Sequence, residues 1–240
     1  MPRAYVCLPT YNERENLEPM VTALLERLGP ENRVLVIDDS SPDGTGELAD
    51  GLAAKYDRVE VLHRPAKEGL GPAYLAGFRR ALAGGAELIL EVDCDFSHDP
   101  GDVPRLIAAA ADADLVLGSR YVAGGHTENW GLARRFVSRA GSLYAQTILW
   151  APVKDLTGGF KCYRREVLER IDLDSISARG YAFQIETTYR ALRAGFRVVE
   201  VPITFTDRET GTSKMSGSIV LEAIWRVPYL GLLALLRRLR

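Results

Sequence analysis

Two carboxylates separated by a single residue follow an apolar run, LILEV, near the middle of the chain. Asp93 and Asp95 stand at the end of this expected strand, where the alternation of side chains turns the intervening Cys94 to the other side. Carboxylate oxygens suit Mg²⁺ or Mn²⁺ that bridges to a substrate diphosphate. In the alternative interpretation, Asp95, Ser97 or Asp99 only caps a helix that begins near Pro100. The location at a strand end favours the metal site.

A second acidic pair, Asp38 and Asp39, also follows an apolar run. These side chains either contact a ribose or base, or they shape the turn before Pro42 and Gly44, and the pair alone favours the turn. The next segment, GTGELA, imitates a G-x-G-x-x-A dinucleotide fingerprint. In that fingerprint the first glycine comes directly after the strand, whereas here SSPD intervenes, so we reject a nicotinamide site.

Arginine supplies most of the positive charge, since 25 of the 30 basic residues are Arg. Arginine forks match phosphate oxygens in pairs, so cations in apolar or glycine-rich surroundings are candidates for binding phosphate. These candidates are Arg120, Arg134, Arg135, Arg208 and Lys214.

Composition argues against several other classes of protein. A net charge of -2 and a pI near 6.0 provide no basic field for a nucleic acid. The three cysteines lie far apart without a CxxC pair, which argues against a disulfide framework or a cysteine zinc site. The chain has no G-x-S-x-G elbow, and its segment GLGPAYLAG lacks the lysine of a Walker A loop. The amino-terminal residues carry no signal-peptide core, so we expect a cytoplasmic protein.

Strands and helices are expected to alternate along most of the chain, as judged from apolar runs and helical spacing. Such alternation is typical of a doubly wound α/β fold with a mostly parallel sheet, because parallel neighbours need crossover helices. Ligands then bind beyond the carboxyl ends of the strands, where the acidic pairs lie. The expected strands are 4–8, 34–38, 59–63, 88–92, 115–117 and 198–205, and the expected helices are 17–28, 48–56, 70–83, 103–111, 132–149 and 181–194.

The last residues differ in character from the rest. We treat residues 1–215 as one domain and residues 216–240 as a carboxyl-terminal amphipathic helix. The longest uncharged stretch, 227–236, would span roughly 15 Å as a helix, about half of the ~30 Å hydrocarbon core of a bilayer. This helix either packs on the domain or lies in a membrane interface with its arginines on lipid headgroups.

Eight segments then occur in a characteristic order: LPTYNERENL, VIDDSSPDGT, EGLGPAY, DCDFSHDP, GSRY, DLTGGFKCYRR, GYAFQIE and FTDRETGTSK. Together they resemble the dolichyl- and polyprenyl-phosphate mannose synthases, which are family-2 inverting glycosyltransferases with the GT-A fold. The resemblance implies transfer of mannose from GDP-mannose to a polyprenyl or dolichyl monophosphate, with Mg²⁺ or Mn²⁺ as cofactor. It also implies a peripheral location on the cytosolic face of a membrane, with a small integral membrane protein as a further partner.

The resemblance also implies roles for individual positions. Residues implied to line the guanosine pocket are Pro9, Tyr11, Glu13, Ile37 and Asp39. Residues implied to contact the diphosphate and its metal are Asp93, Cys94, Asp95 and, where some relatives have glutamine, Ser97. Residues implied to bind the phosphates of donor and acceptor are Arg120, Arg134, Arg208 and Lys214, and Gln184 is implied to contact substrate. The implied catalytic set is Asp95, Arg120, Arg208 and Lys214.

Other functions are weighed against this one. Transfer of glucose from UDP-glucose to the same lipid stays open, because a pair of carboxylates does not read the base. A nucleotide-sugar pyrophosphorylase would have a glycine-rich loop after the first strand, where this chain has PTYNERE. A non-catalytic membrane module would not need paired carboxylates at the ligand edge of the sheet.

Overall fold

The structure is a computed structural model that describes residues 2–178, 180–207 and 217–236, without the side chains of 217–223. Its strands are β1 (Ala4–Thr10), β2 (Arg33–Asp38), β3 (Val59–His63), β4 (Leu88–Glu91), β5 (Leu115–Ser119), β6 (His126–Glu128), β7 (Lys161–Arg164), β8 (Val198–Pro202) and β9 (Thr204–Thr206). Its α-helices are α1 (Arg14–Arg27), α2 (Thr45–Lys55), α3 (Leu70–Ala83), α4 (Val103–Ala109), α5 (Leu132–Leu149), α6 (Arg165–Arg170), α7 (Tyr181–Arg193) and α8 (Gly217–Leu235).

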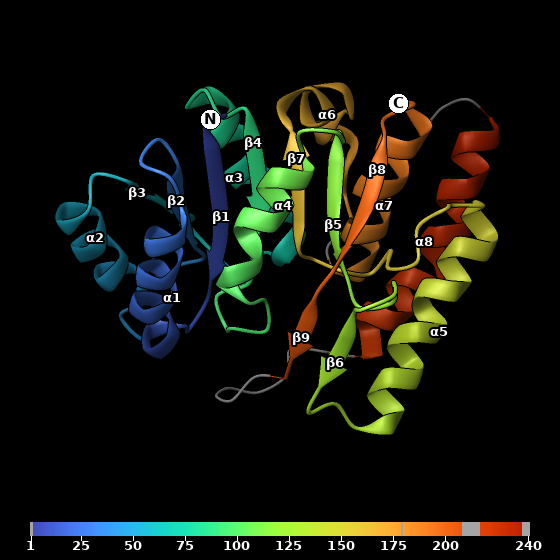
Figure 1. The fold of residues 1–240 in the computed structure, drawn as a ribbon. Coiled ribbons are helices and arrows are strands. Elements are labelled where there is room, and N and C mark those ends of the chain that lie inside the picture. Colours follow the sequence, from blue (N-terminus) through green and yellow to red (C-terminus); the bar gives the residue numbers. More distant parts are fainter. Residues whose placement is uncertain (1, 179, 208–216, 237–240) are drawn as a thin grey trace.

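A seven-stranded sheet runs through the molecule in the order β3-β2-β1-β4-β7-β5-β8, and helices cover both faces (Figure 1). A second, two-stranded sheet pairs β6 with β9 in parallel. This arrangement confirms the expected α/β fold with a mostly parallel sheet. The carboxyl ends of β1, β2, β4 and β5 all lie at the same end of the sheet as the β6–β9 ribbon (Figure 1).

The alternation of side chains in β1 explains why the sheet has a core on each face. Tyr5 and Cys7 belong to the cluster that packs against α3 and α7, whereas Val6 and Leu8 belong to the cluster under α1 and α4. Both sets of side chains are almost completely buried. Strands buried on both faces read as continuous apolar runs, which is why the sequence predicted them.

Helix α3 packs unusually close to the sheet because glycine faces it. A β-carbon on Gly77 would lie 2.3 Å from Cδ1 of Ile37 and 3.2 Å from Sγ of Cys7. The first distance is shorter than a real contact between two non-bonded carbon atoms, so an alanine here would force the buried Ile37 side chain to shift.

Two parts of the sheet differ from the prediction. β7 was not predicted, and it pairs antiparallel with both β4 and β5, so it interrupts the parallel order. Its four residues, KCYR, contain two charged side chains and form no apolar run. The predicted strand 198–205 is two strands, because the chain leaves β5 after Pro202 and pairs with β6 from Thr204 onward.

Helix α8 lies beside α5 and α7 at one end of the molecule, far from α2 (Figure 1). Val227, Leu230 and Ala234 are buried on its inner face, whereas Trp225 and Leu235 are about four-fifths exposed (78% and 80%). The described part of α8 is therefore apolar on both faces, which differs from the amphipathic helix that we expected. Within the described ranges, no helix is long and apolar enough to cross a membrane.

Candidate active site

Three segments that the sequence singled out meet at one edge of the sheet. In the parallel pairing of β1 with β2, Thr10 lies beside Asp38. The amide of Val92, just after β4, donates a hydrogen bond of 3.2 Å to the carbonyl oxygen of Cys7 in β1. The two acidic pairs therefore leave β2 and β4, the strands on either side of β1, at the same end, as parallel pairing requires.

The pocket expected for the nucleoside is built around Tyr11 and Asp39. The Lys67 ammonium lies 3.9 Å from the centre of the Tyr11 ring, and Nη1 of Arg64 donates to Oδ1 of Asp39 at 2.5 Å. The second terminal nitrogen of Arg64 contacts Glu68 at 2.5 Å. Burial raises the pKa of Asp39, and the Arg64 guanidinium opposes this effect. Sequence reasoning missed Arg64, Lys67 and Glu68, although all three follow the third strand directly.

Other residues expected in this pocket lie partly inside the protein. Ile37 is completely buried beneath α3, so the structure does not support its expected contact with the nucleoside. Pro9 is half-buried in β1. Oε2 of Glu13 accepts a hydrogen bond of 3.0 Å from Nδ2 of Asn16 at the start of α1. Glu13 thus helps to order the loop that carries Tyr11.

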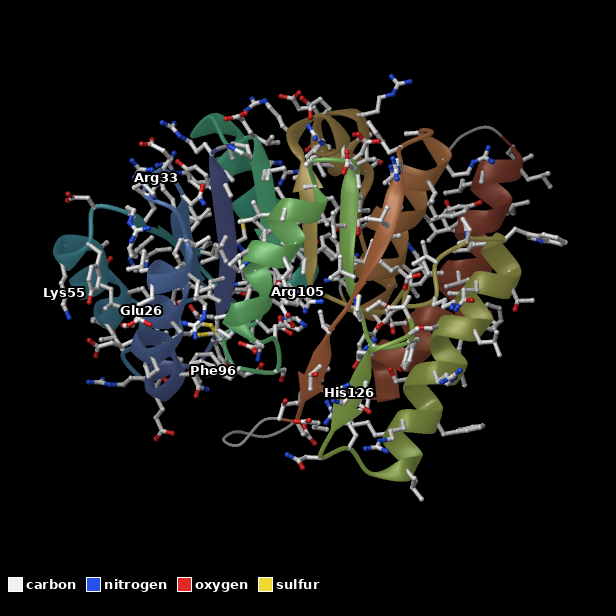
Figure 2. The ribbon with its side chains drawn as sticks, viewed as in Figure 1. Glu26, Arg33, Lys55, Phe96, Arg105 and His126 are labelled. Atoms are coloured by element: carbon white, nitrogen blue, oxygen red, sulfur yellow. The ribbon has the colours of Figure 1, made fainter. Side chains whose placement is uncertain are left out.

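The carboxylates after β4 are held by a tight turn. Oδ1 of Asp95 accepts the Ser97 amide at 3.0 Å, and the intervening Phe96 has a left-handed φ of 59°. Oδ1 of Asp93 accepts the Tyr74 hydroxyl at 3.3 Å. Figure 2 places Phe96 at the same end of the sheet as His126 of β6. Cys94 turns away from this edge, as the alternation of side chains predicted, and is 3% exposed in the core. Its buried thiol therefore does not contact the diphosphate, which the resemblance had implied.

His98 supports this turn from behind. Its Nδ1 accepts the backbone amide of Asp93 at 3.2 Å, which assigns the ring proton to Nε2. The ring stacks on Phe160 at 4.8 Å and meets the edge of Phe205 at 5.3 Å. Burial lowers the pKa of His98, so the ring is neutral. His98 therefore connects the carboxylate turn to β9.

Asp93 and Asp95 supply the kind of oxygen ligands that Mg²⁺ and Mn²⁺ take. Asp93 is 28% exposed in its side chain, and Asp95 is 7% exposed as a residue. In the part of the chain that the structure describes, no three His, Cys, Asp or Glu side chains gather into a complete cage. Two carboxylates without a third protein carboxylate suit an ion whose remaining ligands are substrate phosphates and water. Ser97, expected as a third ligand, is buried in the same turn.

A buried polar network lies beneath the carboxylate turn. The completely buried Glu91 accepts the Tyr163 hydroxyl at 2.7 Å and Nε2 of Gln184 at 2.7 Å. The ammonium of Lys161 donates to the Gln184 carbonyl at 2.8 Å and to Thr187 Oγ1 at 3.2 Å. Burial raises the pKa of Glu91 and lowers the pKa of Lys161 to about 8. Gln184, which the resemblance implied to be a substrate contact, is thus 2% exposed and bonded inside the protein.

Arg120 is clamped at the end of β5. Its Nε and Nη2 donate to the two oxygens of Asp155 at 2.7 and 2.6 Å, and Nη2 also donates to Thr157 at 2.9 Å. Both partners of the ion pair are almost completely buried. Burial disfavours the charged form of Arg120, but the Asp155 carboxylate overcomes this effect and raises its pKa. Asp155 was quoted only within a motif and was not assigned a role from the sequence.

The structure places Arg134, rather than Arg135, beside Arg120. The Arg134 guanidinium carbon lies 4.3 Å from the centre of the Trp130 ring, and that of Arg120 lies 5.5 Å from the same ring. Nη1 of Arg134 pairs with Asp207 at 2.5 Å. Arg135 is exposed and donates to the carbonyl oxygen of Thr127.

The remaining two candidate cations, Arg208 and Lys214, lie outside the described residues. The described end of β9 stops at Thr206, one residue before the aspartate that pairs with Arg134.

An apolar cavity of about 290 Å³ opens beside Arg134. Helices α5, α7 and α8 form its walls, and Trp130, Tyr144, Tyr181 and Ile185 are among the residues that line it. Sequence reasoning missed this cavity, because it forms only where three helices from distant parts of the chain meet. The candidate site thus combines strand-end carboxylates, two guanidinium groups and an apolar chamber.

Comparisons with known proteins agree with this arrangement. The family model described as glycosyl transferase family 2 matches residues 5–172. The chain belongs to this family, which confirms the expectation from its motifs.

Two curated relatives match along nearly the whole chain. The chain is 50% identical over 240 residues to the polyprenol monophosphomannose synthase of Mycolicibacterium smegmatis, with 99% of this chain and 90% of that protein covered. It is also 50% identical over 232 residues to the undecaprenyl-phosphate mannosyltransferase of Micrococcus luteus, with 97% and 95% covered.

Solved structures share the fold at low sequence identity. Glucosyl-3-phosphoglycerate synthase from Mycobacterium tuberculosis, solved with Mn²⁺, UDP-glucose and phosphoglyceric acid, has a TM-score of 0.71 at 17% identity, covering 96% of this chain and 80% of that one. The mannosyltransferase PcManGT from Pyrobaculum calidifontis, solved with GDP-Man and Mn²⁺, has a TM-score of 0.60 at 17% identity, covering 95% and 70%.

Proposed function

We propose that this chain transfers mannose from GDP-mannose to the phosphate of a polyprenyl monophosphate with inversion, which yields the β-linked lipid sugar and GDP. The observation that carries the proposal is the position of Arg134 at the wall of an apolar cavity of about 290 Å³, stacked on Trp130, with the Arg120 guanidinium 5.5 Å from the same ring. A phosphate attached to a hydrocarbon chain needs a cationic group for the phosphate next to an apolar cavity for the chain. The names of the two relatives at 50% identity support the same substrates.

The donor would lie across the carboxyl ends of β1, β2 and β4. Tyr11, Asp39 and Arg64 offer a ring, an acceptor and a donor for the base and ribose. Asp93 and Asp95 would hold a divalent metal near the diphosphate. When bound, Mg²⁺ or Mn²⁺ would neutralise charge that develops on the leaving diphosphate. The Mn²⁺ in the two structural neighbours supports a divalent ion.

The acceptor needs no general base in this reaction. A phosphate monoester has a second pKa near ~6, so it is mostly ionised at neutral pH and is already a nucleophile. Its difficulty is repulsion from the donor, because two like charges 4 Å apart repel by about 4 kcal/mol at an effective dielectric of 20. Arg134, beside the Arg120–Asp155 ion pair, would offset this repulsion and hold the acceptor phosphate in line for attack on the sugar carbon. Arg134 would exchange Asp207 for the more highly charged phosphate.

Transfer into lipid tests the function and the donor together. We expect radiolabelled mannose to pass from GDP-mannose into a solvent-extractable product when undecaprenyl phosphate is supplied. Label arriving from UDP-glucose instead would favour the alternative donor, and no labelled lipid from either donor would contradict the proposal. Arg134→Gln should abolish most of the transfer, whereas Arg135→Gln, one position further along α5, should retain it.

We propose further that α5 and α8 rest on the membrane that holds the acceptor. Leu132 and Phe136 lie one turn apart on α5 and are 83% and 76% exposed, and Trp150, which caps the carboxyl end of α5, is 91% exposed. Trp225 and Leu235 continue the exposed apolar surface on α8, which is tied to α5 by a 2.9 Å bond from Tyr144 to the Ile224 carbonyl. Large exposed apolar side chains on two packed helices are typical of a contact with a partner or a membrane.

Sedimentation with vesicles of phosphatidylglycerol and phosphatidylethanolamine tests this placement. Phe136→Glu and Trp225→Glu should reduce vesicle binding and turnover of the long-chain acceptor without altering GDP affinity. Ala54→Glu adds the same charge on exposed α2, at the other end of the molecule, and should bind vesicles as the wild type does (Figure 1). Equal binding by all three variants would contradict the proposal.

A further inference from the structure

Two buried nitrogen donors next to the apolar cavity have no acceptor among the residues that the structure describes. They are Nε1 of Trp130 and Nε of Arg134. Trp130 is only 7% exposed, so its indole N–H has lost its water without gaining a protein partner. Buried N–H groups are nearly always bonded, because leaving one unpaired is costly. The pair therefore indicates an oxygen ligand that the protein itself does not provide.

Ring stacking and an ion pair fix the positions of the two donors. The guanidinium of Arg134 lies over the Trp130 ring at 4.3 Å, which is a stacking contact, and Phe205 meets the ring at 5.2 Å with an interplanar angle of 76°. Asp207 occupies Nη1 of Arg134 and leaves Nε outside that ion pair. Trp130 and Arg134 both line the cavity of about 290 Å³. The two N–H groups thus belong to one rigid stacked unit at the wall of the chamber.

The chemistry of the surroundings identifies the ligand class. Two cations, Arg120 and Arg134, lie within 5.5 Å of the Trp130 ring, and each already holds a carboxylate, Asp155 or Asp207. The Nε–H of Arg134 belongs to a cationic group, which favours an oxygen that carries negative charge. The remaining wall is formed largely by apolar and aromatic side chains, among them Val137, Ile185 and Val227. A free sugar or a nucleotide would place polar groups against this wall. A monophosphate esterified to a hydrocarbon chain matches both the cationic N–H donors and the apolar wall.

We infer that Trp130 is an acceptor-binding residue, and that its Nε1–H and the Nε–H of Arg134 together hold an oxygen of the polyprenyl phosphate. This inference rests on the proposed function, since the ligand is the acceptor of that reaction. Trp130 then does more than fill space between two arginines. It selects for phosphate at the mouth of an otherwise apolar chamber, and it orients the phosphate relative to Arg120.

Two replacements at one position separate the N–H group from the ring. Trp130→Phe removes the N–H and part of the ring, whereas Trp130→benzothienylalanine, introduced at this position alone, keeps the ring size and the stacking on Arg134 but has sulfur in place of N–H. The acceptor is citronellyl phosphate, a short soluble isoprenyl monophosphate, so that membrane docking does not enter the measurement. We expect both variants to raise the acceptor KM by roughly 10- to 100-fold, the usual value of a hydrogen bond to a charged group. GDP affinity, measured by calorimetry, and Tm should stay close to wild type in the benzothienylalanine variant.

Several results would overturn the inference. A benzothienylalanine variant with a wild-type KM would show that the ring, and not its N–H, is what the acceptor requires. A fall in kcat at unchanged KM, or an equal loss of GDP affinity, would assign Trp130 to the general structure of the site. If the wild-type protein transfers no mannose to citronellyl or undecaprenyl phosphate, the proposed function fails. If it transfers mannose and the variants match it, only the inference about Trp130 fails.

Discussion

Replacing Asp155 by asparagine should destabilise the protein far more than the same change in a surface ion pair. The Asp155 carboxylate is completely buried and accepts three hydrogen bonds from Arg120, at 2.7, 2.6 and 3.0 Å, the last from its backbone amide. Asp155→Asn leaves the Arg120 guanidinium charged, buried and without its counter-ion. The change also replaces one acceptor oxygen by an amide group that cannot accept a hydrogen bond from the guanidinium.

The magnitude follows from this burial. Removing one partner of a buried ion pair costs about 3–5 kcal/mol, because the remaining charge stays in a medium of low dielectric. In a chain of this length each kcal/mol corresponds to roughly 2–4 °C in Tm, so we expect Tm to fall by about 10 °C. Asp174 provides the matched control, since it pairs with Arg79 at 2.6 Å but the two side chains are 88% and 50% exposed. Asp174→Asn should cost less than about 1 kcal/mol.

Urea unfolding of both variants, followed by circular dichroism, measures the two free energies. A third variant, with Asp155→Leu and Arg120→Met together, removes both charges and should be more stable than Asp155→Asn alone. The reasoning would be refuted if Asp155→Asn and Asp174→Asn lost equal free energy of unfolding. It would also be refuted if the double variant were the least stable of the three.

Three further outcomes are expected. Burial lowers the pKa of Lys161 from 10.5 to about 8, so between these values the unfolded chain binds more protons and stability due to this residue rises with pH. Relative to Lys161→Met, the wild type should therefore gain up to about 3 kcal/mol across this window in urea unfolding, and a constant difference would contradict the shift. Asp95→Asn should keep the wild-type Tm but lose metal-dependent transfer, and full activity with unchanged metal dependence would remove Asp95 from the metal site. Gly77→Ala should destabilise the protein by about 1–3 kcal/mol through overpacking. Gly51→Ala, with nothing within 4 Å of its β-carbon, should not destabilise it. Equal stability of the two variants would contradict the close packing of α3.

The strands that the sequence predicted well are those buried on both faces. The runs in β1, β2 and β4 are continuous and apolar, and each was predicted within two residues of its observed bounds. β7 escaped prediction because its first residue, Lys161, is charged yet completely buried. Its ammonium donates to the Gln184 carbonyl of α7, more than twenty residues further along the chain. No local pattern therefore predicts that Lys161 is buried.

The site was predictable where its residues sit next to strands in the sequence. Asp93, Asp95 and Arg120 all follow strand ends directly, so the rule for parallel sheets located them. Asp155 and Trp130 lie in loops. The role of Asp155 depends on Arg120, 35 residues away in the chain, and the role of Trp130 depends on Arg134 of α5, which stacks on its ring. An aspartate or a tryptophan in a loop has no local spacing to mark it, so only the folded chain reveals these contacts.

The order of strands has a consequence for synthesis on the ribosome. β4 finds its outer neighbour only in β7, and Glu91 pairs with Lys161, 70 residues later in the chain (161 minus 91). At a synthesis rate of about 5–20 residues per second, the β4 edge stays without β7 for roughly 4–14 s. During this interval the unpaired amides and carbonyls of an apolar strand can join a strand of another nascent chain. The first four strands of the growing protein therefore form a sheet with an unpaired, aggregation-prone edge at β4 until β7 has been synthesised and pairs with it.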